Sequence, residues 1–347
     1  MYKFFEKLKE NVKALNSEQI KTVFTIATTS KQESDPYLTP IRKNNFFIAC
    51  GCVIFDQSSL TKILKIIDGS IDLIFVDSEK KIPVRIGQNI DISKDSNLFQ
   101  ICLKKIHKSK IFEYKPSDIT VNATWSFLSQ RLNYLSGKKI SILGCGNIGS
   151  KLALKLVESD AVVSIYRRNN YKGYYISKGI NLIKPENNLS NVTFNKDVIN
   201  TIHMSDVIVG ASNGISVIDK NLLKKIKNQV IVIDLGKNTL TKDAIQFAQL
   251  NNIEIYRTDI TSAFEAFIYE ALRLNDLLSK SYGIKDLGYC SIIGGGYFGK
   301  RGDIVVDNIT HPTTVFGVAA GDGTMKKKLS RQDKEKIIKL KMKYNKF

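Results

Sequence analysis

The sequence lacks any long apolar run, and this absence excludes one class of protein. A membrane-spanning helix needs about 20 consecutive, mainly apolar residues, and no stretch of the 347-residue chain provides them. The first ten residues mix charged and aromatic side chains, unlike a secretory signal peptide. We therefore expect a soluble, cytoplasmic protein with no membrane partner.

Cysteine and histidine are both scarce. The five cysteines, an odd number, lie at positions 50, 52, 102, 145 and 290 without a C-x-x-C pair, so neither a disulfide framework nor a zinc site is indicated. We predict no metal. Cys50 and Cys52 alternate along an apparent strand and are predicted to pack in a core, and Cys145 is predicted to be a small filler. The three histidines leave few candidates for an acid–base group.

Acidic residues are under-represented, with 33 Asp and Glu against 52 Lys and Arg and a net charge of +19. The imbalance is uneven, because residues 325–347 hold ten Lys and Arg against Asp333 and Glu335. We interpret this segment as a basic, solvated and partly helical tail. Contact with an acidic partner or with nucleic acid is the alternative, and nucleic acid is the disfavoured partner.

The most informative pattern is an apolar strand, residues 139–143, that leads into G-x-G-x-x-G and then into apolar residues at helical spacing. In dinucleotide-binding folds the first glycine allows a sharp turn, the second lets backbone N–H groups approach phosphate, and the third lets the helix pack closely. This pattern predicts a pyrophosphate-binding loop. Its predicted cofactor-binding residues are Gly144, Gly146, Asn147, Ile148 and Gly149.

The next predicted strand, residues 161–166, indicates which dinucleotide binds. Its end, where an acid would bind the ribose 2′-hydroxyl of NAD, carries Arg167, Arg168 and Asn169. Guanidinium groups bind a 2′-phosphate through charge-assisted hydrogen bonds, and Lys172 would add a third cation. The pattern favours NADP, with NAD as the second choice. Arginines that merely face solvent are the alternative interpretation.

Strands and helices alternate along the chain, which predicts an α/β protein. Its centre is a doubly wound parallel Rossmann sheet in the order 3-2-1-4-5-6, with the third strand expected at residues 180–183. Four segments are predicted: a smaller N-terminal α/β substrate or catalytic domain at 1–118, the NADP-binding Rossmann domain at 119–262, a return helix and glycine-rich segment lining the cleft at 263–324, and the basic tail at 325–347.

Over residues 120–265 the sequence resembles the cofactor domain shared by methylenetetrahydrofolate dehydrogenases, adenosylhomocysteinase, shikimate-type dehydrogenases and the dipicolinate synthase family. Besides the glycine loop, the likeness rests on VGASNG at 209–214 and VIDLGKN at 232–238. The N-terminal segment lacks a folate-type Tyr-x-x-x-Lys motif, so the substrate stays open. The resemblance implies that the nicotinamide half of the cofactor is flanked by Ala211, Ser212, Asp234 and Gly236.

Two residues are candidates for the chemistry. His311 lies in a polar stretch after an apolar strand, where a loop can approach a ligand; a hydrogen-bonded turn histidine is the alternative. Lys31 follows the first strand of the N-terminal segment, and ligands gather at the carboxyl ends of parallel strands; a solvated loop lysine is the alternative. Arg42, Lys43 and Asp35 are weaker candidates of the same kind.

The function most favoured by the sequence is that of an NADP-dependent oxidoreductase. It would transfer a hydride to a small polar carbonyl or imine, or from the corresponding alcohol or amine, in a cleft between domains. The second hypothesis is a dinucleotide-binding regulatory or redox-sensing protein without net turnover. A homo-oligomer is left open.

Overall fold

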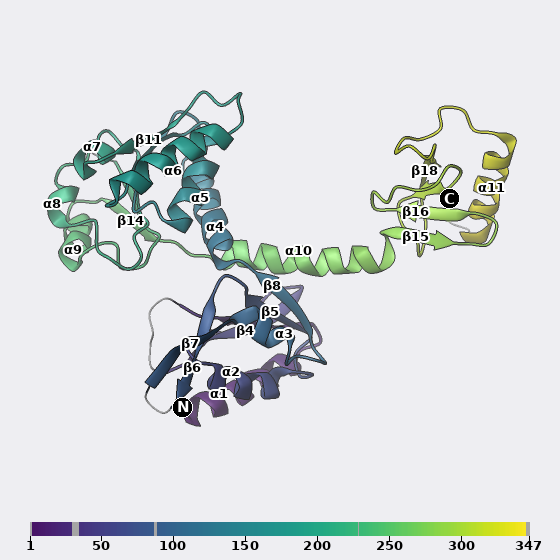
Figure 1. Cartoon of the computed structure of the whole chain (residues 1–347), viewed down its shortest axis with the longest axis horizontal. Helices are drawn as coiled ribbons and strands as arrows, with labels where there is room; N and C mark the ends of the chain where they lie inside the picture. Colours follow the sequence, from purple (N-terminus) through teal and green to yellow (C-terminus); the bar gives the residue numbers. More distant parts are fainter. Residues whose placement is uncertain (1, 30–34, 87–88, 228, 345–347) are drawn as a thin grey trace. The chain divides into compact units, whose positions relative to one another are not determined.

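The computed structural model describes residues 2–29, 35–86, 89–227 and 229–344 (Figure 1). The chain divides into two compact units, residues 1–263 and 264–347. The first unit holds two six-stranded sheets, which we call the N-terminal sheet and the Rossmann sheet, and the second unit holds one four-stranded sheet. Each unit is described by itself.

The N-terminal sheet is built on four parallel strands in the order β4-β1-β5-β8. The chain passes from β1 to β4 on one side of β1 and then returns to β5 on its other side, so the winding direction reverses between β1 and β5. Two short strands run antiparallel to β4. The bounds are β1 Lys21–Ala27, β2 Tyr37–Leu38, β3 Arg42–Lys43, β4 Phe47–Val53, β5 Leu73–Asp77 and β8 Lys110–Tyr114.

Three helices pack on the N-terminal sheet, namely α1 Tyr2–Asn16, α2 Gln57–Ile67 and α3 Leu98–Leu103. Leu60 and Ile63 of α2 share one buried cluster with alternate strand residues such as Ile74. Cys50 and Cys52 lie in the same cluster, which confirms their predicted role in core packing. Burial raises the pKa of the Cys50 thiol to about 12, so this side chain is an unreactive core residue.

Two elements of this region were not identified from the sequence. Helix α1 is rich in charged residues, yet Leu8, Val12 and Leu15 recur at helical spacing and are buried. A hairpin of β6 Lys81–Ile86 and β7 Asn89–Asn97 follows β5. Polar residues dominate β7, so its strand pattern is weak.

The Rossmann sheet has six parallel strands in the order β11-β10-β9-β12-β13-β14, which confirms the predicted 3-2-1-4-5-6 order. The predicted third strand at 180–183 is wrong, because these residues end a helix whose Ile176 and Ile180 pack into the core at helical spacing. The strand bounds are β9 Lys139–Leu143, β10 Val162–Tyr166, β11 Val192–Asn195, β12 Val207–Gly210, β13 Ile231–Asp234 and β14 Glu254–Arg257.

The helices of the Rossmann region are α4 Pro116–Arg131, α5 Asn147–Val157, α6 Asn170–Ile183, α7 Val198–Ile202, α8 Lys220–Leu223 and α9 Lys242–Leu250. Helices α6 to α9 begin with a polar side chain that accepts a hydrogen bond from a first-turn N–H group. Helix α5 differs, because its N-cap residue is Gly146 and no side chain caps it. The positive end of α5 is therefore available to an anionic ligand.

The second unit starts within α10 Thr261–Lys280 and continues into a small sheet with the strand order β15-β16-β17-β18. β16 and β17 are parallel, and the two outer pairings are antiparallel. The remaining bounds are β15 Gly283–Asp286, β16 Ser291–Gly294, β17 Ile304–Val306, β18 Val315–Val318 and α11 Arg331–Tyr344.

Helix α11 corrects the expectation for the basic tail. Leu340 is fully buried in one cluster with Ile292 and Ile304 of the small sheet. Near the start of the helix, Lys326 Nζ lies 2.8 Å from the buried carboxylate of Asp333. The predicted helical part of the tail is confirmed as α11, and most of its side chains are exposed. The tail is not a free extension, because one face of α11 packs against the small sheet of the second unit.

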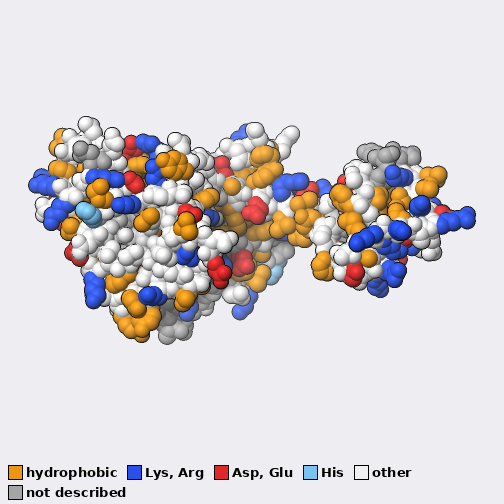
Figure 2. All heavy atoms as spheres, turned by 90° about the horizontal axis from the view of Figure 1, so that it is seen from above, with side chains coloured by type: hydrophobic (Ala, Val, Ile, Leu, Met, Phe, Trp, Pro, Cys, Tyr) orange, Lys and Arg blue, Asp and Glu red, His pale blue; other side chains and the backbone are white. Residues whose placement is uncertain are grey.

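Lys and Arg side chains from several helices and strands lie on the surface. Figure 2 shows Lys and Arg side chains distributed over the visible face of the molecule, with Asp and Glu among them, and not gathered in a single patch. Within the described ranges, no helix combines the length and the apolar character that crossing a membrane requires.

Candidate dinucleotide-binding site

The loop between β9 and α5 adopts the geometry that its three glycines require. Gly144 has φ +101°, which disfavours other residues, and a Cβ there would lie 2.6 Å from the backbone nitrogen of Ser212. A Cβ on Gly149 would lie 2.6 Å from the carbonyl oxygen of Gly144. The first and third glycines therefore allow close backbone packing.

Gly146 is different, because nothing lies within 4 Å of a Cβ built on it. It forms the N-cap of the 11-residue helix α5. The N–H groups of Asn147, Ile148 and Gly149 belong to the first turn of that helix, where the dipole is positive. Open space in front of an uncapped helix end fits a pyrophosphate, and these N–H groups would hold it.

The end of β10 supplies the cations predicted from the sequence, but in two different roles. Arg167 is half-buried and donates a guanidinium N–H to the carbonyl oxygen of Cys145. Arg168 and Lys172 are exposed. Asn169 accepts a hydrogen bond from the Lys172 N–H at 2.9 Å and so starts α6. Arg167 thus braces the glycine loop, whereas Arg168 and Lys172 face solvent at the position expected for a 2′-phosphate.

The predicted loops after β12 and β13 also meet the glycine loop. The Ala211 N–H donates to the Leu143 carbonyl oxygen at 2.8 Å, and the Ser212 hydroxyl donates to the Ile215 carbonyl oxygen. A Cβ on Gly236 would lie 2.0 Å from the Ser212 carbonyl oxygen. The fold therefore places Ala211 and Ser212 beside the glycine loop, and Gly236 against Ser212.

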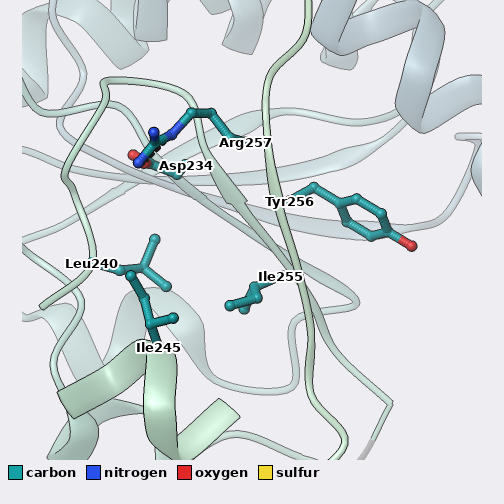
Figure 3. A pocket seen from close by; sticks show the side chains of 6 residues that line it. All are labelled: Asp234, Leu240, Ile245, Ile255, Tyr256 and Arg257. Atoms are coloured by element: carbon teal, nitrogen blue, oxygen red, sulfur yellow. Dashed lines mark hydrogen bonds and ion pairs between the residues drawn. The ribbon is translucent and has the colours of Figure 1, made fainter. Parts of the chain in front are cut away.

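Asp234 has a local structural role in this arrangement. Its carboxylate accepts hydrogen bonds from the Asn238 N–H at 3.0 Å and from the Thr239 hydroxyl at 2.7 Å, and Arg257 Nε donates to it at 3.2 Å. Figure 3 shows the Arg257 guanidinium beside Asp234, at a cavity of about 180 Å³ whose other walls are mainly apolar. Asp234 organises the loop after β13, and its predicted contact with the nicotinamide half stays a prediction.

The structure describes only one of the two catalytic candidates. His311 is exposed in the second unit, where its backbone N–H donates to Asn308 Oδ1 at 3.0 Å. This is a hydrogen-bonded turn, and its predicted role in proton transfer stays a prediction. Lys31 lies outside the described residues. Arg42 donates to the Thr261 hydroxyl and Lys43 pairs with Glu18 at 2.7 Å.

The described residues include no cluster of three or more His, Cys, Asp or Glu suited to a metal ion.

A polar link between the N-terminal sheet and α5 was missed in the sequence. Glu79, just after β5, accepts a hydrogen bond from the Ser117 N–H at 2.9 Å at the start of α4. Lys151 of α5 lies 2.6 Å from Asp118 and 3.6 Å from Glu79. No sequence motif marks these residues, because the link joins three elements that are distant along the chain.

Asp77 was also missed, although it ends a parallel strand. Its side chain is fully buried, and Oδ2 is one of the few buried polar atoms without a hydrogen-bond partner in the described residues. Burial raises the pKa of the carboxyl to about 6, against the lowering effects of the Glu79 N–H and Lys80. A carboxyl at the end of an apolar strand is the signal that could have drawn attention to it.

Comparison with known proteins supports the cofactor assignment. Residues 113–264 match the family model described as D-isomer specific 2-hydroxyacid dehydrogenase, NAD binding domain. No curated protein sequence matches the chain. The match includes the glycine loop and the whole Rossmann sheet.

Several solved structures are similar to this chain at low sequence identity. A dipicolinate synthase structure from Bacillus halodurans is 15% identical, with 73% of this chain and 97% of that chain covered and a TM-score of 0.37. Shikimate 5-dehydrogenase from Listeria monocytogenes is 12% identical, with 73% and 94% covered and a TM-score of 0.40. These TM-scores are low, and the assignment rests on the family match and the loop geometry.

The glycine loop, the strand order and the family match together define the class. The chain is a Rossmann-fold, NAD(P)-binding protein of the dehydrogenase type. It is an NAD(P)-dependent oxidoreductase, a dehydrogenase or reductase with a nicotinamide dinucleotide as its cofactor.

Proposed function

We propose that this oxidoreductase prefers NADP(H) to NAD(H). The observation that carries the proposal is the end of β10, where Arg168 and Lys172 are exposed and no acid is present at positions 167–169. An acid there would bind the ribose 2′-hydroxyl of NAD and repel a 2′-phosphate. Two cations instead would form charge-assisted hydrogen bonds with the phosphate.

The proposed reaction is hydride transfer between NADP(H) and a small polar metabolite, in a cleft between the N-terminal and Rossmann regions. The metabolite would be a carbonyl or imine in one direction and an alcohol or amine in the other. Because the matched family model is named for 2-hydroxyacid dehydrogenases, 2-oxo and 2-hydroxy acids are the first substrate class to test. His311 and Lys31 remain the candidates from the sequence for proton transfer and substrate anchoring.

We place the enzyme in the cytoplasm, without a membrane or nucleic-acid partner and with a homo-oligomer left open.

The test is titration of the purified chain with NADPH and NADH, followed by the same titrations on Arg168→Ala/Lys172→Ala. We expect the double variant to lose most of the NADPH preference, with NADH affinity nearly unchanged. Lys178→Ala is the matched control, since Lys178 is an exposed lysine of the same helix. Equal affinities for both dinucleotides in the parent protein would overturn the NADP assignment.

A dinucleotide-binding regulator without turnover is the competing function. It predicts binding of NADPH without oxidation of the cofactor by any member of a panel of 2-oxo acids, aldehydes, ketones and imines. Consumption of NADPH by the parent chain, dependent on one of these compounds and absent in Gly146→Val, would exclude it.

A further inference from the structure

Asp77 lies at the point in the N-terminal sheet where a ligand is expected. The strand order β4-β1-β5-β8 reverses its winding direction between β1 and β5. In open parallel sheets the crevice outside the carboxyl ends of strands at such a reversal is the usual ligand site. Asp77 is the last residue of β5 and therefore lies at that edge of the sheet, where its side chain is fully buried.

The side chain of Asp77 is buried but only half satisfied. Oδ1 accepts a hydrogen bond from the Glu79 N–H at 2.8 Å, whereas Oδ2 has no partner in the described residues. Buried polar atoms are nearly always hydrogen-bonded in folded proteins, so an orphan carboxyl oxygen calls for an explanation. A bound group that donates a hydrogen bond would supply the missing partner of Asp77 Oδ2.

The surroundings of Asp77 are suited to proton exchange. Tyr114 of β8 lies beside it in register, and its hydroxyl pKa is raised by burial and by the charge of Asp77. Glu79 and Lys80 follow Asp77 along the chain. The charge of Glu79 raises the pKa of the Asp77 carboxyl, and the charge of Lys80 lowers it. The raised pKa of Asp77 lies close to neutral pH, where a general acid or base is most effective.

Asp77 is also connected to the cofactor region. Glu79, two residues further, contacts Ser117 at the start of α4 and lies 3.6 Å from Lys151. Lys151 belongs to α5, the helix that the glycine loop opens. The carboxyl edge of β5 is therefore tied to the helix that would hold the pyrophosphate.

We propose that Asp77 is the catalytic carboxyl that exchanges a proton with the substrate during hydride transfer. In the oxidative direction the C–H bond breaks and its electron pair leaves as hydride to NADP⁺. The O–H or N–H bond of the substrate also breaks, its electron pair forms the C=O or C=N bond, and its proton passes to Asp77 Oδ2. The reductive direction reverses each step. This assignment rests on the proposed oxidoreductase function.

The test compares Asp77→Asn with Asp56→Asn. Asp56 is also a buried acid after a strand of this sheet, but both its oxygens accept hydrogen bonds from serines at the start of α2. Asparagine is an equally good N-cap residue, so the control should fold. NADPH affinity, turnover with the 2-oxo and 2-hydroxy acid panel, and the pH profile are measured for parent and variants.

We expect Asp77→Asn to lower turnover by about 10²- to 10⁴-fold and to leave NADPH affinity within about twofold, while Asp56→Asn keeps near-parental turnover. In the parent, the oxidative rate should fall below pH 6 and the reductive rate should fall above it, and this dependence should vanish in Asp77→Asn. A second readout needs no turnover: the Asp77 carboxyl resonance in the NADP⁺ complex should titrate near pH 6 and shift when a substrate acid is added.

The possible failures are distinguishable. A parent chain that binds NADPH but consumes none with any compound of the panel overturns the proposed function and this assignment with it. Near-parental turnover in Asp77→Asn, or a retained pH dependence, overturns the assignment of Asp77 alone and leaves the oxidoreductase function intact.

Discussion

Arg167 donates a hydrogen bond from its guanidinium group to the carbonyl oxygen of Cys145, at the centre of the glycine loop. The sequence predicted both Arg167 and Arg168 as ligands of a 2′-phosphate. The structure separates their roles, because Arg167 is half-buried against the loop and Arg168 is exposed. The two arginines should therefore respond differently to substitution.

Arg167→Ala should weaken NADPH and NADH to a similar extent, since the loop that binds the shared pyrophosphate loses its brace. Arg168→Ala should weaken NADPH by about 10- to 100-fold and leave NADH nearly unchanged, because a charge-assisted hydrogen bond contributes about 1.5 to 3 kcal/mol. Fluorescence titration with both cofactors checks this. A selective loss of NADPH in Arg167→Ala would show that Arg167 leaves Cys145 and binds the phosphate.

Gly146→Val should abolish dinucleotide binding and leave the fold intact, because the added side chain enters the open space where the pyrophosphate is expected. Gly149→Ala is the contrasting variant. Its Cβ would meet the Gly144 carbonyl oxygen at 2.6 Å, so we expect a loss of about 1 to 3 kcal/mol in stability. Thermal unfolding and cofactor titration together separate the two effects. Normal cofactor affinity in folded Gly146→Val would remove the loop from the binding site.

Stability should fall as the pH rises from about 4 to about 6 because of Asp77. Its folded-state pKa of about 6 is above the ordinary value of 3.8. Over that interval the unfolded chain has released the proton that the folded chain still holds, so raising the pH favours unfolding. A shift of about two units corresponds to about 3 kcal/mol. Urea unfolding from pH 4 to pH 8 should show the fall in the parent and a flatter profile in Asp77→Asn.

His311→Asn distinguishes the histidine candidate from Asp77. If His311 relays the proton, its replacement should lower turnover by about 10²- to 10⁴-fold with normal NADPH affinity. If Asp77 exchanges the proton, His311→Asn should keep near-parental turnover, as its exposed turn position suggests. Steady-state kinetics of both variants, measured side by side, decide between the two residues.

Leu340→Ala should destabilise the second unit by about 2 to 5 kcal/mol, because this fully buried side chain joins α11 to the small sheet. Met342→Ala is the matched control, since Met342 is 71% exposed on the same helix. Proteolysis of the second unit should accelerate only in Leu340→Ala. Equal protease resistance in both variants would restore the expectation of a solvated tail.

Most of the Rossmann region could be predicted from the sequence. Its strands are short runs of β-branched residues, and the glycines of its first loop require one backbone geometry. The third strand was misplaced because Ile180, Leu182 and Ile183 form a short apolar run at the end of a helix. The packing of helix α11 was not predicted, because lysines interrupt the row of apolar side chains formed by Ile337, Leu340 and Tyr344. In both cases the packing partner, and not the local pattern, decides the outcome.

The candidate site was only partly predictable for a related reason. Motifs reveal residues that bind through the backbone, such as Gly146, because their spacing along the chain is constrained. Asp77 and Lys151 act through contacts between distant segments, and only the folded sheet shows which segments meet. The hydrogen bond from Arg167 to the Cys145 carbonyl oxygen was not foreseen, because the sequence does not show where a long side chain turns. Its predicted contact with a 2′-phosphate stays a prediction.

The contact of Glu79 with Lys151 has a thermodynamic consequence. Glu79 lies two residues after the strand that ends at Asp77, and Lys151 belongs to α5, the helix that begins at the glycine loop. We expect this ion pair to couple the two segments, so that substrate and cofactor should each bind more tightly in the presence of the other. Because Lys151 and Glu79 are only partly buried, added salt weakens their attraction. The mutual dependence of the two ligands should therefore decline with ionic strength before the fold itself is affected.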